Sequence, residues 1–263
     1  MIKEQLTIEE ARIVAECAKD INKFYQYAQI ISENGYESFK PRKFQKDMLN
    51  SFVNSYESEE PGIKRNYIVK NTRQSGFTTG LTVYALWFAI FHPERCVGIM
   101  APKNGQATEI LYRVRDMHSR LPDFLRPKTK TNNNSCIRFE NNTQIFACAA
   151  SSSSVRGKTV DLLIIDDFAH MGGRETDDFM MSVFPTQASR MRAQMIIGST
   201  PTTTNHPFCM LHAKAKMNLN SFNAIDIPWN CTKGRDTKWK KKIIRDYGED
   251  FFKHEFGGEF MEE

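Results

Sequence analysis

The stretch LLIIDD at residues 162–167 decides the fold class of this chain of 263 residues. Four consecutive apolar residues predict a short strand buried on both faces, and the two acids mark its carboxyl end. Open α/β sheets bind ligands at that edge. In a P-loop ATPase the first acid, here Asp166, holds Mg²⁺ through water, and the second, here Asp167, polarises the attacking water. A strand that ends in a polar turn shows the same pattern, so the acids need support from the rest of the chain.

Short apolar runs alternate with helical segments on both sides of this strand. The expected strands are 67–69, 96–101, 162–165 and 195–198, a hairpin-like pair covers 137–139 and 144–146, and the expected helices are 78–91 and 104–120. Such alternation predicts an α/β fold with a mostly parallel sheet and crossover helices. Because the apolar runs are continuous, we expect helices on both faces of the sheet.

Helical patterns also precede and follow this α/β region. Residues 7–32 are expected to be helical after a capping box formed by Thr7 and Glu10, and residues 42–57 form a second helix. From residue 207 the alternation stops, which predicts a small helical lid subdomain. The expected parts are therefore an N-terminal helical segment that packs with the lid (1–40), an ATPase core (41–206), and a lid and linker (207–263).

The loop after the first expected strand has some of the features that bind phosphate. Residues 71–79 read NTRQSGFTT and lead directly into a helix. Gly76 suits the turn and Thr78 supplies a hydroxyl for Mg²⁺, at a helix N-terminus whose free N–H groups attract anions. The motif G-x-x-x-x-G-K-[ST] is broken twice, because Asn71 replaces the first Gly and Phe77 occupies the position of the lysine.

Composition narrows the class of protein. Lys and Arg number 36 against 31 Asp and Glu, a net charge of +5 that is compatible with nucleic-acid binding but does not establish it. The six cysteines include no C-x-x-C pair, which argues against a zinc or redox site, and the six histidines show no ligand spacing. The sequence contains neither a signal-peptide pattern nor an apolar run of membrane-spanning length, so we expect a soluble, intracellular protein.

Further motifs follow one another in a definite order along the chain. Upstream of the loop, Arg42 and Gln45 belong to a segment that suits an adenine edge, because a Gln amide both donates and accepts hydrogen bonds. The series continues with R-Q-x-G-x-T-T at 73–79, A-P-K at 101–103, V-R-G at 155–157, the acid-tipped strand, and S-T-P at 199–201. Over residues 40–260 this order resembles the N-terminal ATPase, or DNA-packaging motor, domain of tailed-phage terminase large subunits. The stretches LPDFLRP at 121–127 and HEFGGEF at 254–260 are also similar to that family.

The resemblance implies a P-loop NTPase of the RecA-like, ASCE type that hydrolyses ATP with Mg²⁺ and translocates double-stranded DNA into a procapsid. It implies a portal protein and a small terminase subunit as partners, and a homo-oligomeric ring that is pentameric on the capsid, while a monomer in solution is compatible with it. No membrane partner is expected, and the expected location of this virus-encoded protein is the host cell cytoplasm. Because the nuclease domain of the family would follow Glu263, we expect no DNA cleavage from this chain.

The resemblance also assigns residues to nucleotide binding and to the coupling of hydrolysis to movement. The expected nucleotide-binding residues are Arg42, Gln45, Lys70, Arg73, Gln74, Ser75, Gly76, Phe77, Thr78 and Thr79, with Gln45 on the adenine. The expected coupling residues are Ser199 and Thr200.

Metal binding and catalysis follow from the same motifs. Thr78 would bind Mg²⁺ directly and Asp166 through water, while Asp167 would position the lytic water. Arg156 resembles the arginine finger that some members insert into a neighbouring subunit's site. Arg73 completes the expected catalytic set.

Two departures from the family pattern affect this site. Phe77 cannot supply a cation, so another residue must neutralise the triphosphate, and Arg73 is the first candidate and Lys70 the second. Asp167 stands where the family usually has Glu, and its shorter side chain needs help from the backbone or from a bridging water.

Two other functions remain open at this point. A helicase-like DNA translocase uses the same fold but needs a second RecA-like domain, for which the chain leaves no length. A degenerate P-loop domain that binds nucleotide or serves assembly, with little turnover, is favoured by Phe77. The paired acids oppose this second alternative, because burying carboxylates without a metal is costly.

Overall fold

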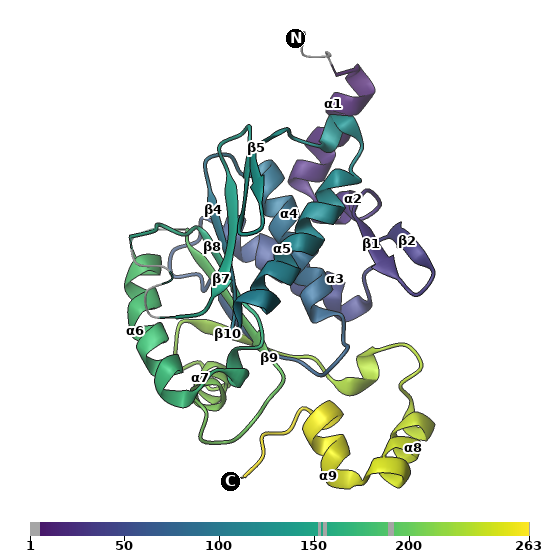
Figure 1. Ribbon diagram of the computed structural model, residues 1–263, viewed down its shortest axis with the longest axis vertical. Helices are drawn as coiled ribbons and strands as arrows, with labels where there is room; N and C mark the ends of the chain where they lie inside the picture. The colour runs from purple at the N-terminus through teal and green to yellow at the C-terminus, as the bar shows by residue number, and fades with distance from the viewer. Residues whose placement is uncertain (1–5, 152–153, 155–156, 189–191, 263) are drawn as a thin grey trace.

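An eight-stranded sheet forms the centre of the computed structural model, which describes residues 6–151, 154, 157–188 and 192–262 (Figure 1). Its strands lie in the order β10-β3-β9-β8-β4-β7-β6-β5. The bounds are β3 (Asn66–Lys70), β4 (Cys96–Ala101), β5 (Thr129–Asn133), β6 (Cys136–Phe139), β7 (Gln144–Ala149), β8 (Leu162–Ile165), β9 (Gln194–Ser199) and β10 (Phe222–Asp226). The strands from β10 to β7 pair in parallel, whereas β6 and β5 pair antiparallel. The predicted mostly parallel α/β sheet is confirmed.

Helices cover both faces of this sheet and bury a separate apolar core on each. One face carries α1 (Ile8–Lys19), α2 (Ile21–Phe24), α3 (Lys43–Glu57), α4 (Phe77–Phe91) and α5 (Asn104–Ser119), and the other carries α6 (Gly173–Ala188) and α7 (Pro207–Lys216). Alternate residues of one strand enter different cores: Leu162 and Ile164 face the first, and Leu163 and Ile165 face the second. The continuous apolar run of β8 therefore follows from burial on both sides.

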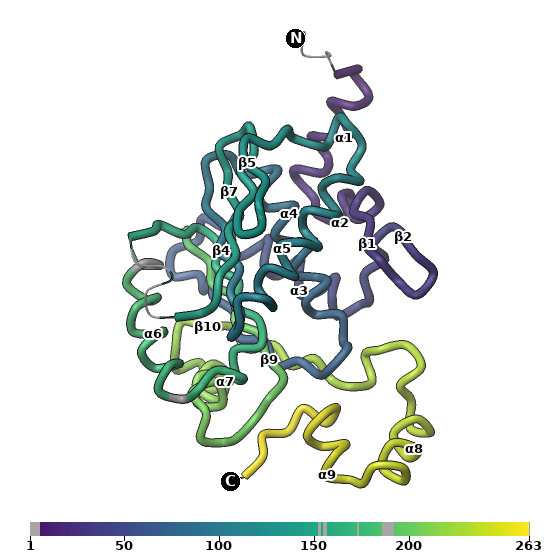
Figure 2. The backbone as a smooth tube through the Cα atoms, in the orientation of Figure 1, coloured from purple at the N-terminus to yellow at the C-terminus, as the bar shows by residue number. Residues whose placement is uncertain are grey.

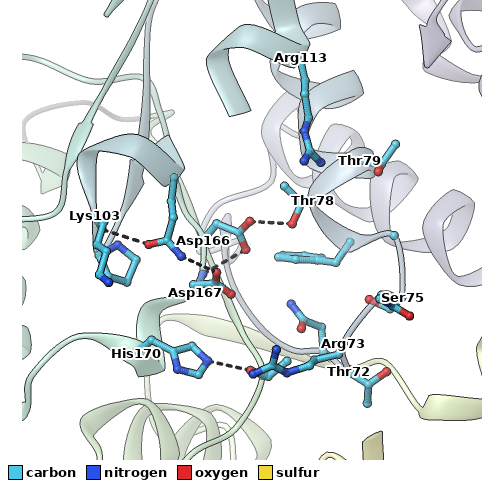
Figure 3. A pocket seen from close by; sticks show the side chains of 17 residues that line it. Thr72, Arg73, Ser75, Thr78, Thr79, Lys103, Arg113, Asp166, Asp167 and His170 are labelled. Atoms are coloured by element: carbon cyan, nitrogen blue, oxygen red, sulfur yellow. Dashed lines mark hydrogen bonds between the residues drawn. The ribbon is translucent and has the colours of Figure 1, made fainter. Parts of the chain in front are cut away.

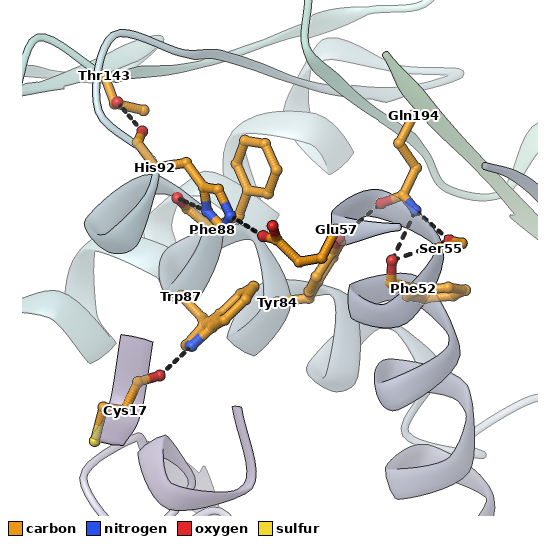
Figure 4. A network of polar contacts seen from close by, with 10 residues as sticks. All are labelled: Cys17, Phe52, Ser55, Glu57, Tyr84, Trp87, Phe88, His92, Thr143 and Gln194. Carbon is orange, nitrogen blue, oxygen red and sulfur yellow. Dashed lines mark hydrogen bonds and ion pairs between the residues drawn. The ribbon is translucent and has the colours of Figure 1, made fainter. Parts of the chain in front are cut away.

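Helix α4, which follows the loop, is largely buried. Its side chains are buried almost all round, and its few polar groups find partners inside the core (Figure 4). The Trp87 Nε1–H donates to the Cys17 carbonyl at 2.7 Å, and the Tyr84 hydroxyl donates to Gln194 Oε1 at 2.6 Å. Because a buried polar group without a partner costs free energy, these bonds fix the orientation of α4 relative to β9 and α1.

The N-terminal region differs from the expected single helix over 7–32. The capping box of Thr7 and Glu10 is present, but α1 ends at Lys19, α2 covers one turn, and a hairpin of β1 (Gln29–Ser32) and β2 (Gly35–Ser38) follows. Asp20 interrupts the helix because its side chain accepts from the Asn22 N–H and caps a new helix. These helices pack on the core beside α3 and α4, not with the C-terminal helices as predicted, because Cys17, Ile21 and Phe24 are buried there.

The C-terminal region also starts later than predicted. Residues 207–226 form α7 and β10, and β10 extends the sheet beside β3, so the sheet does not end at residue 206. Beyond it, α8 (Thr237–Tyr247) and α9 (Glu249–Phe252) form a small helical subdomain (Figure 2). The stacked rings of Trp229 and Trp239 lie at its centre and contact Phe252. The chain then returns to the sheet domain, where Met261 pairs with Thr203. Within the described residues, none of the helices has the length and apolarity that crossing a bilayer requires.

Candidate active site

A cavity of about 650 Å³ opens beyond the carboxyl ends of β3, β4, β8 and β9 (Figure 3). It is lined by residues 71–79, Pro102, Lys103, Gln106, Arg113, Asp166, Asp167, His170 and Thr200. The loop between β3 and α4 therefore lies across from the acids that follow β8, as the sequence predicts for ligands of an open α/β sheet.

The loop before α4 turns sharply and is held at both of its ends. Gln74 has a φ of 56° and Gly76 a φ of 86°, so the chain takes the left-handed region twice within three residues. At its start, the Asn71 N–H donates to the Ser199 carbonyl at 2.9 Å. Near its end, a Cβ at Gly76 would lie 3.0 Å from Gln45 Nε2, so both the conformation and the space call for glycine.

Arg42 and Gln45, which are predicted to bind the nucleotide, both contact the loop. The Gln45 amide donates to the Gly76 carbonyl at 2.8 Å, and its oxygen accepts from the Arg42 N–H at 2.8 Å. The Arg42 guanidinium donates to the Ser75 carbonyl. Both side chains thus support the loop backbone, and neither lines the cavity.

Thr78 and Asp166 both line the cavity and contact each other directly. The Thr78 hydroxyl donates to Asp166 Oδ2 at 2.7 Å, which joins the first turn of α4 to the tip of β8. Asp166 is buried, and this burial raises the pKa of its carboxyl to about 7, with the negative charge of Asp167 as a second cause. The hydrogen bond from Thr78 and the charge of Arg113 act in the opposite direction. A hydroxyl beside a carboxylate is a hard oxygen pair of the type that Mg²⁺ binds.

Asp167 points into the same cavity from an unusual backbone conformation. Its φ is 55°, and its backbone N–H donates to Asp166 Oδ1 at 3.1 Å. The Gln106 amide lies 3.4 Å from Asp167 Oδ2. Sequence reasoning missed Gln106, and the only available signal was its place in the first turn of a helix that follows an apolar strand and A-P-K.

Phe77 is buried, and its ring lies on the backbone of β9. A Cβ at Gly198 would come within 2.0 Å of Phe77 Cε1, so the ring occupies the space that a side chain at 198 would need. The aromatic residue at the lysine position is therefore a packing residue that fixes the start of α4 against the sheet, and it contributes no charge.

The two predicted replacement cations are both engaged elsewhere. The Lys70 ammonium lies 3.7 Å from Asp226 Oδ1 and 5.6 Å from the centre of the Phe260 ring, and Lys70 is not among the cavity residues. Arg73 does line the cavity, but its guanidinium forms an ion pair with Glu255 of the C-terminal subdomain. Two cations outside the predicted nucleotide-binding set, Lys103 and Arg113, also line the cavity.

The C-terminal subdomain contacts the loop through a second arginine. Arg235 is buried and donates from Nη1 to the Arg73 carbonyl at 2.9 Å. Its guanidinium lies 5.1 Å from the centre of the Trp239 ring and 4.9 Å from that of Phe256. The loop and the subdomain are thus joined at one point by Arg235 and the Arg73–Glu255 pair.

Ser199 and Thr200 lie at the end of β9, between the loop and the acids. The Ser199 hydroxyl accepts from the Ala169 N–H at 3.0 Å, in the short helix η2 (Phe168–His170) that follows Asp167. The Thr200 hydroxyl lies 2.9 Å from His170 Nε2, and both residues line the cavity. Arg156, the predicted arginine finger, lies outside the described residues.

Comparison with known proteins agrees with this arrangement. The family described as terminase large subunit, T4likevirus-type, N-terminal, matches residues 70–263, which is most of the chain. The chain belongs to the terminase large subunit family.

Solved terminase structures share the fold. The ATPase domain of the Thermus phage P74-26 large terminase superposes with a TM-score of 0.64 at 19% identity, over 85% of this chain and 95% of that one. The HK97 large terminase gives 0.69 at 15% identity, over 97% of this chain and 56% of that one. A third large terminase, from a thermophilic bacteriophage and in complex with ADP, gives 0.60 at 15% identity, over 81% of this chain and 52% of that one. This terminase chain therefore spans about half the length of the second and third of these proteins.

Membership of the terminase family supports ATPase activity in general. The third of these large terminases has been solved with ADP and with ATP-gamma-S.

Proposed function

We propose that this chain is the Mg²⁺-dependent ATPase motor of viral DNA packaging, which hydrolyses ATP to translocate double-stranded DNA into a procapsid. The observation that carries the proposal is the 2.7 Å contact between the Thr78 hydroxyl and Asp166 Oδ2. This contact brings the loop that precedes α4 next to the acid-tipped strand, so a single Mg²⁺ ion can bind residues of both.

The residues around this point fit a hydrated Mg²⁺ and a triphosphate. Thr78 and Asp166 would hold the ion, which when bound would neutralise charge on the phosphate oxygens. A buried carboxylate with a raised pKa is costly in its charged form, and a divalent cation removes that cost. The carboxylate of Asp167 would orient the attacking water, and the Gln106 amide would hold that carboxylate in place.

The contacts around β9 support a route from hydrolysis to movement. The Ser199 carbonyl accepts from the Asn71 N–H of the loop, and the Ser199 hydroxyl accepts from the Ala169 N–H of η2. A movement of the loop would therefore displace η2, and with it the adjacent Asp167, through this one residue. We assign the coupling role to Ser199 and Thr200, and the role of a finger that enters a neighbour's site to Arg156. Binding to a portal protein and a small terminase subunit, and assembly into a ring in the host cytoplasm, complete the proposal.

Steady-state ATPase assays with and without double-stranded DNA test this proposal. Asp167→Asn should lower kcat by about 10²- to 10⁴-fold, the usual contribution of a positioned acid or base, and leave the KM for ATP within a few-fold. Asp123→Asn, at an exposed acid of the short helix Asp123–Leu125, is the matched control and should turn over at the wild-type rate. Wild-type turnover in Asp167→Asn would refute the assignment, and an inactive wild type that still binds nucleotide would favour the degenerate P-loop alternative.

A further inference from the structure

The phosphate loop, residues 71–79, carries no unpaired cation. Phe77 is buried where the loop lysine would stand, and Lys70 is paired with Asp226 outside the cavity. Arg73 is held by Glu255 of the C-terminal subdomain. A triphosphate with one Mg²⁺ still carries about two negative charges, and an enzyme needs a fixed positive group beside them to stabilise the transferring phosphoryl.

Helix α5 supplies the remaining cations of the cavity. Among the described residues that line it, the side chains with a permanent positive charge are Arg73, Lys103 and Arg113. Lys103 is the exposed residue before the first turn of α5, on the side of Asp167. Arg113 comes from the middle of α5, and its guanidinium points towards Thr78 and Thr79 at the start of α4 (Figure 3).

We propose that Arg113 replaces the missing loop lysine and binds the terminal phosphate of the nucleotide in the same subunit. The inference rests on the proposed function. In the proposed function, Thr78 and Asp166 bind the metal and Asp167 positions the attacking water. The Arg113 guanidinium therefore lies at the end of the cavity that would hold the terminal phosphate.

Arg113 has both a rigid base and room to move. Its neighbours Ile110, Leu111, Val114 and Met117 are buried, so the helix backbone is fixed against the sheet. The side chain itself is 47% exposed and is held by one ion pair on the helix surface, from Nε to Glu109 Oε1 at 3.2 Å. Such an exposed pair is worth little, so phosphate can displace Glu109 at low cost.

A second cavity gives the side chain this room. It measures about 460 Å³, lies between the β1–β2 hairpin, α4 and α5, and shares Arg113 and Thr79 with the first. Arg113 therefore forms part of the boundary between the two spaces, and a rotation of its side chain turns the guanidinium towards the phosphates without moving α5. An arginine suits this role because its planar fork binds two phosphate oxygens at once.

Calorimetric titration of the full chain with Mg²⁺·ATP-gamma-S and with Mg²⁺·ADP tests the inference. Arg113→Ala should weaken binding of the triphosphate analogue about 10- to 100-fold, the range for loss of a charge-assisted hydrogen bond, and ADP by about threefold or less. Arg113→Lys should recover part of the loss. Glu109→Gln breaks the same ion pair but leaves the guanidinium, so it should bind both nucleotides within about twofold of wild type.

Three results would overturn the inference: unchanged affinity of Arg113→Ala for the triphosphate analogue, an equal loss for both nucleotides, or the same loss in Glu109→Gln. If Lys103→Ala alone shows the selective loss, the cation is Lys103 and the inference is wrong. A wild type that binds neither nucleotide refutes the proposed function itself, whereas a binding wild type with an unaffected Arg113→Ala refutes only this inference.

Discussion

Gly198→Ala tests the packing that replaces the loop lysine. Gly198 lies near the end of β9, opposite Val69 of β3, and the ring of Phe77 rests on its backbone. A Cβ at this position would lie 2.0 Å from Phe77 Cε1 and 2.2 Å from Cζ. One added methyl group therefore meets the residue that begins α4, immediately before Thr78.

The energetic cost of Gly198→Ala follows from the distances between the added Cβ and the Phe77 ring. Non-bonded carbons are most favourable at about 3.5–4.0 Å, so the ring must shift by about 1.5 Å. Phe77 is 2% exposed, so its ring is closely packed on most sides and can shift only towards the cavity that it lines. Overpacking of this kind costs about 1–3 kcal/mol in the free energy of unfolding. For a domain of this size, that lowers Tm by about 2–12 °C.

Thermal unfolding of a double-mutant cycle measures the effect. Phe77→Leu removes much of the ring, so the free energy lost by Gly198→Ala should be smaller in the Phe77→Leu background than in the wild type, with a coupling of about 1–3 kcal/mol. Gly198→Ala should also weaken nucleotide binding, because the displaced ring moves Thr78. If the two losses add, or if Gly198→Ala unfolds at the wild-type temperature, the contact does not set the position of α4.

Three further predictions follow from buried groups. Burial raises the pKa of Asp166 from 3.8 to about 7 in the folded state. Between pH 3.8 and pH 7 the folded state therefore binds more protons than the unfolded state, so the free energy of unfolding of the metal-free protein falls as pH rises. Asp166→Asn should therefore unfold like the wild type near pH 4 and be more stable by up to about 4 kcal/mol at pH 8 in urea titrations with EDTA. Arg235→Ala should speed amide hydrogen exchange at residues 71–76 while strand β7 exchanges as before, because the loop loses its bond to the C-terminal subdomain. Gln194→Leu should cost about 2–4 kcal/mol in calorimetry, because it removes the partner of the Tyr84 hydroxyl inside the core.

The parts of the fold that the sequence predicted are those with a strong local pattern. The buried run of β8 and the apolar helix after the loop are unmistakable, because burial on both faces leaves no polar positions. The N-terminal hairpin and β10 were missed. Strand β10 is half-polar at the edge of the sheet, and only its pairing with β3 makes it a strand.

The site shows the same division between local and long-range information. The order of the motifs placed the loop and the acids at one edge, since parallel strands end together. Sequence order could not show that Gln45 would support the loop backbone, because that depends on the carbonyl of Gly76 facing α3. Nor could it show that Glu255, far along the chain, would hold Arg73, or that Arg113 from the next helix would reach the cavity.

The central claim is that Thr78 and Asp166 serve a single magnesium ion bound to a triphosphate. A crystal structure of the wild-type chain grown with Mg²⁺ and ATP-gamma-S measures this directly. The account predicts one octahedral ion with the Thr78 hydroxyl at about 2.1 Å and Asp166 reached through a coordinated water. An ion bound without either residue, or a nucleotide bound outside the cavity between α4 and β8, would contradict it.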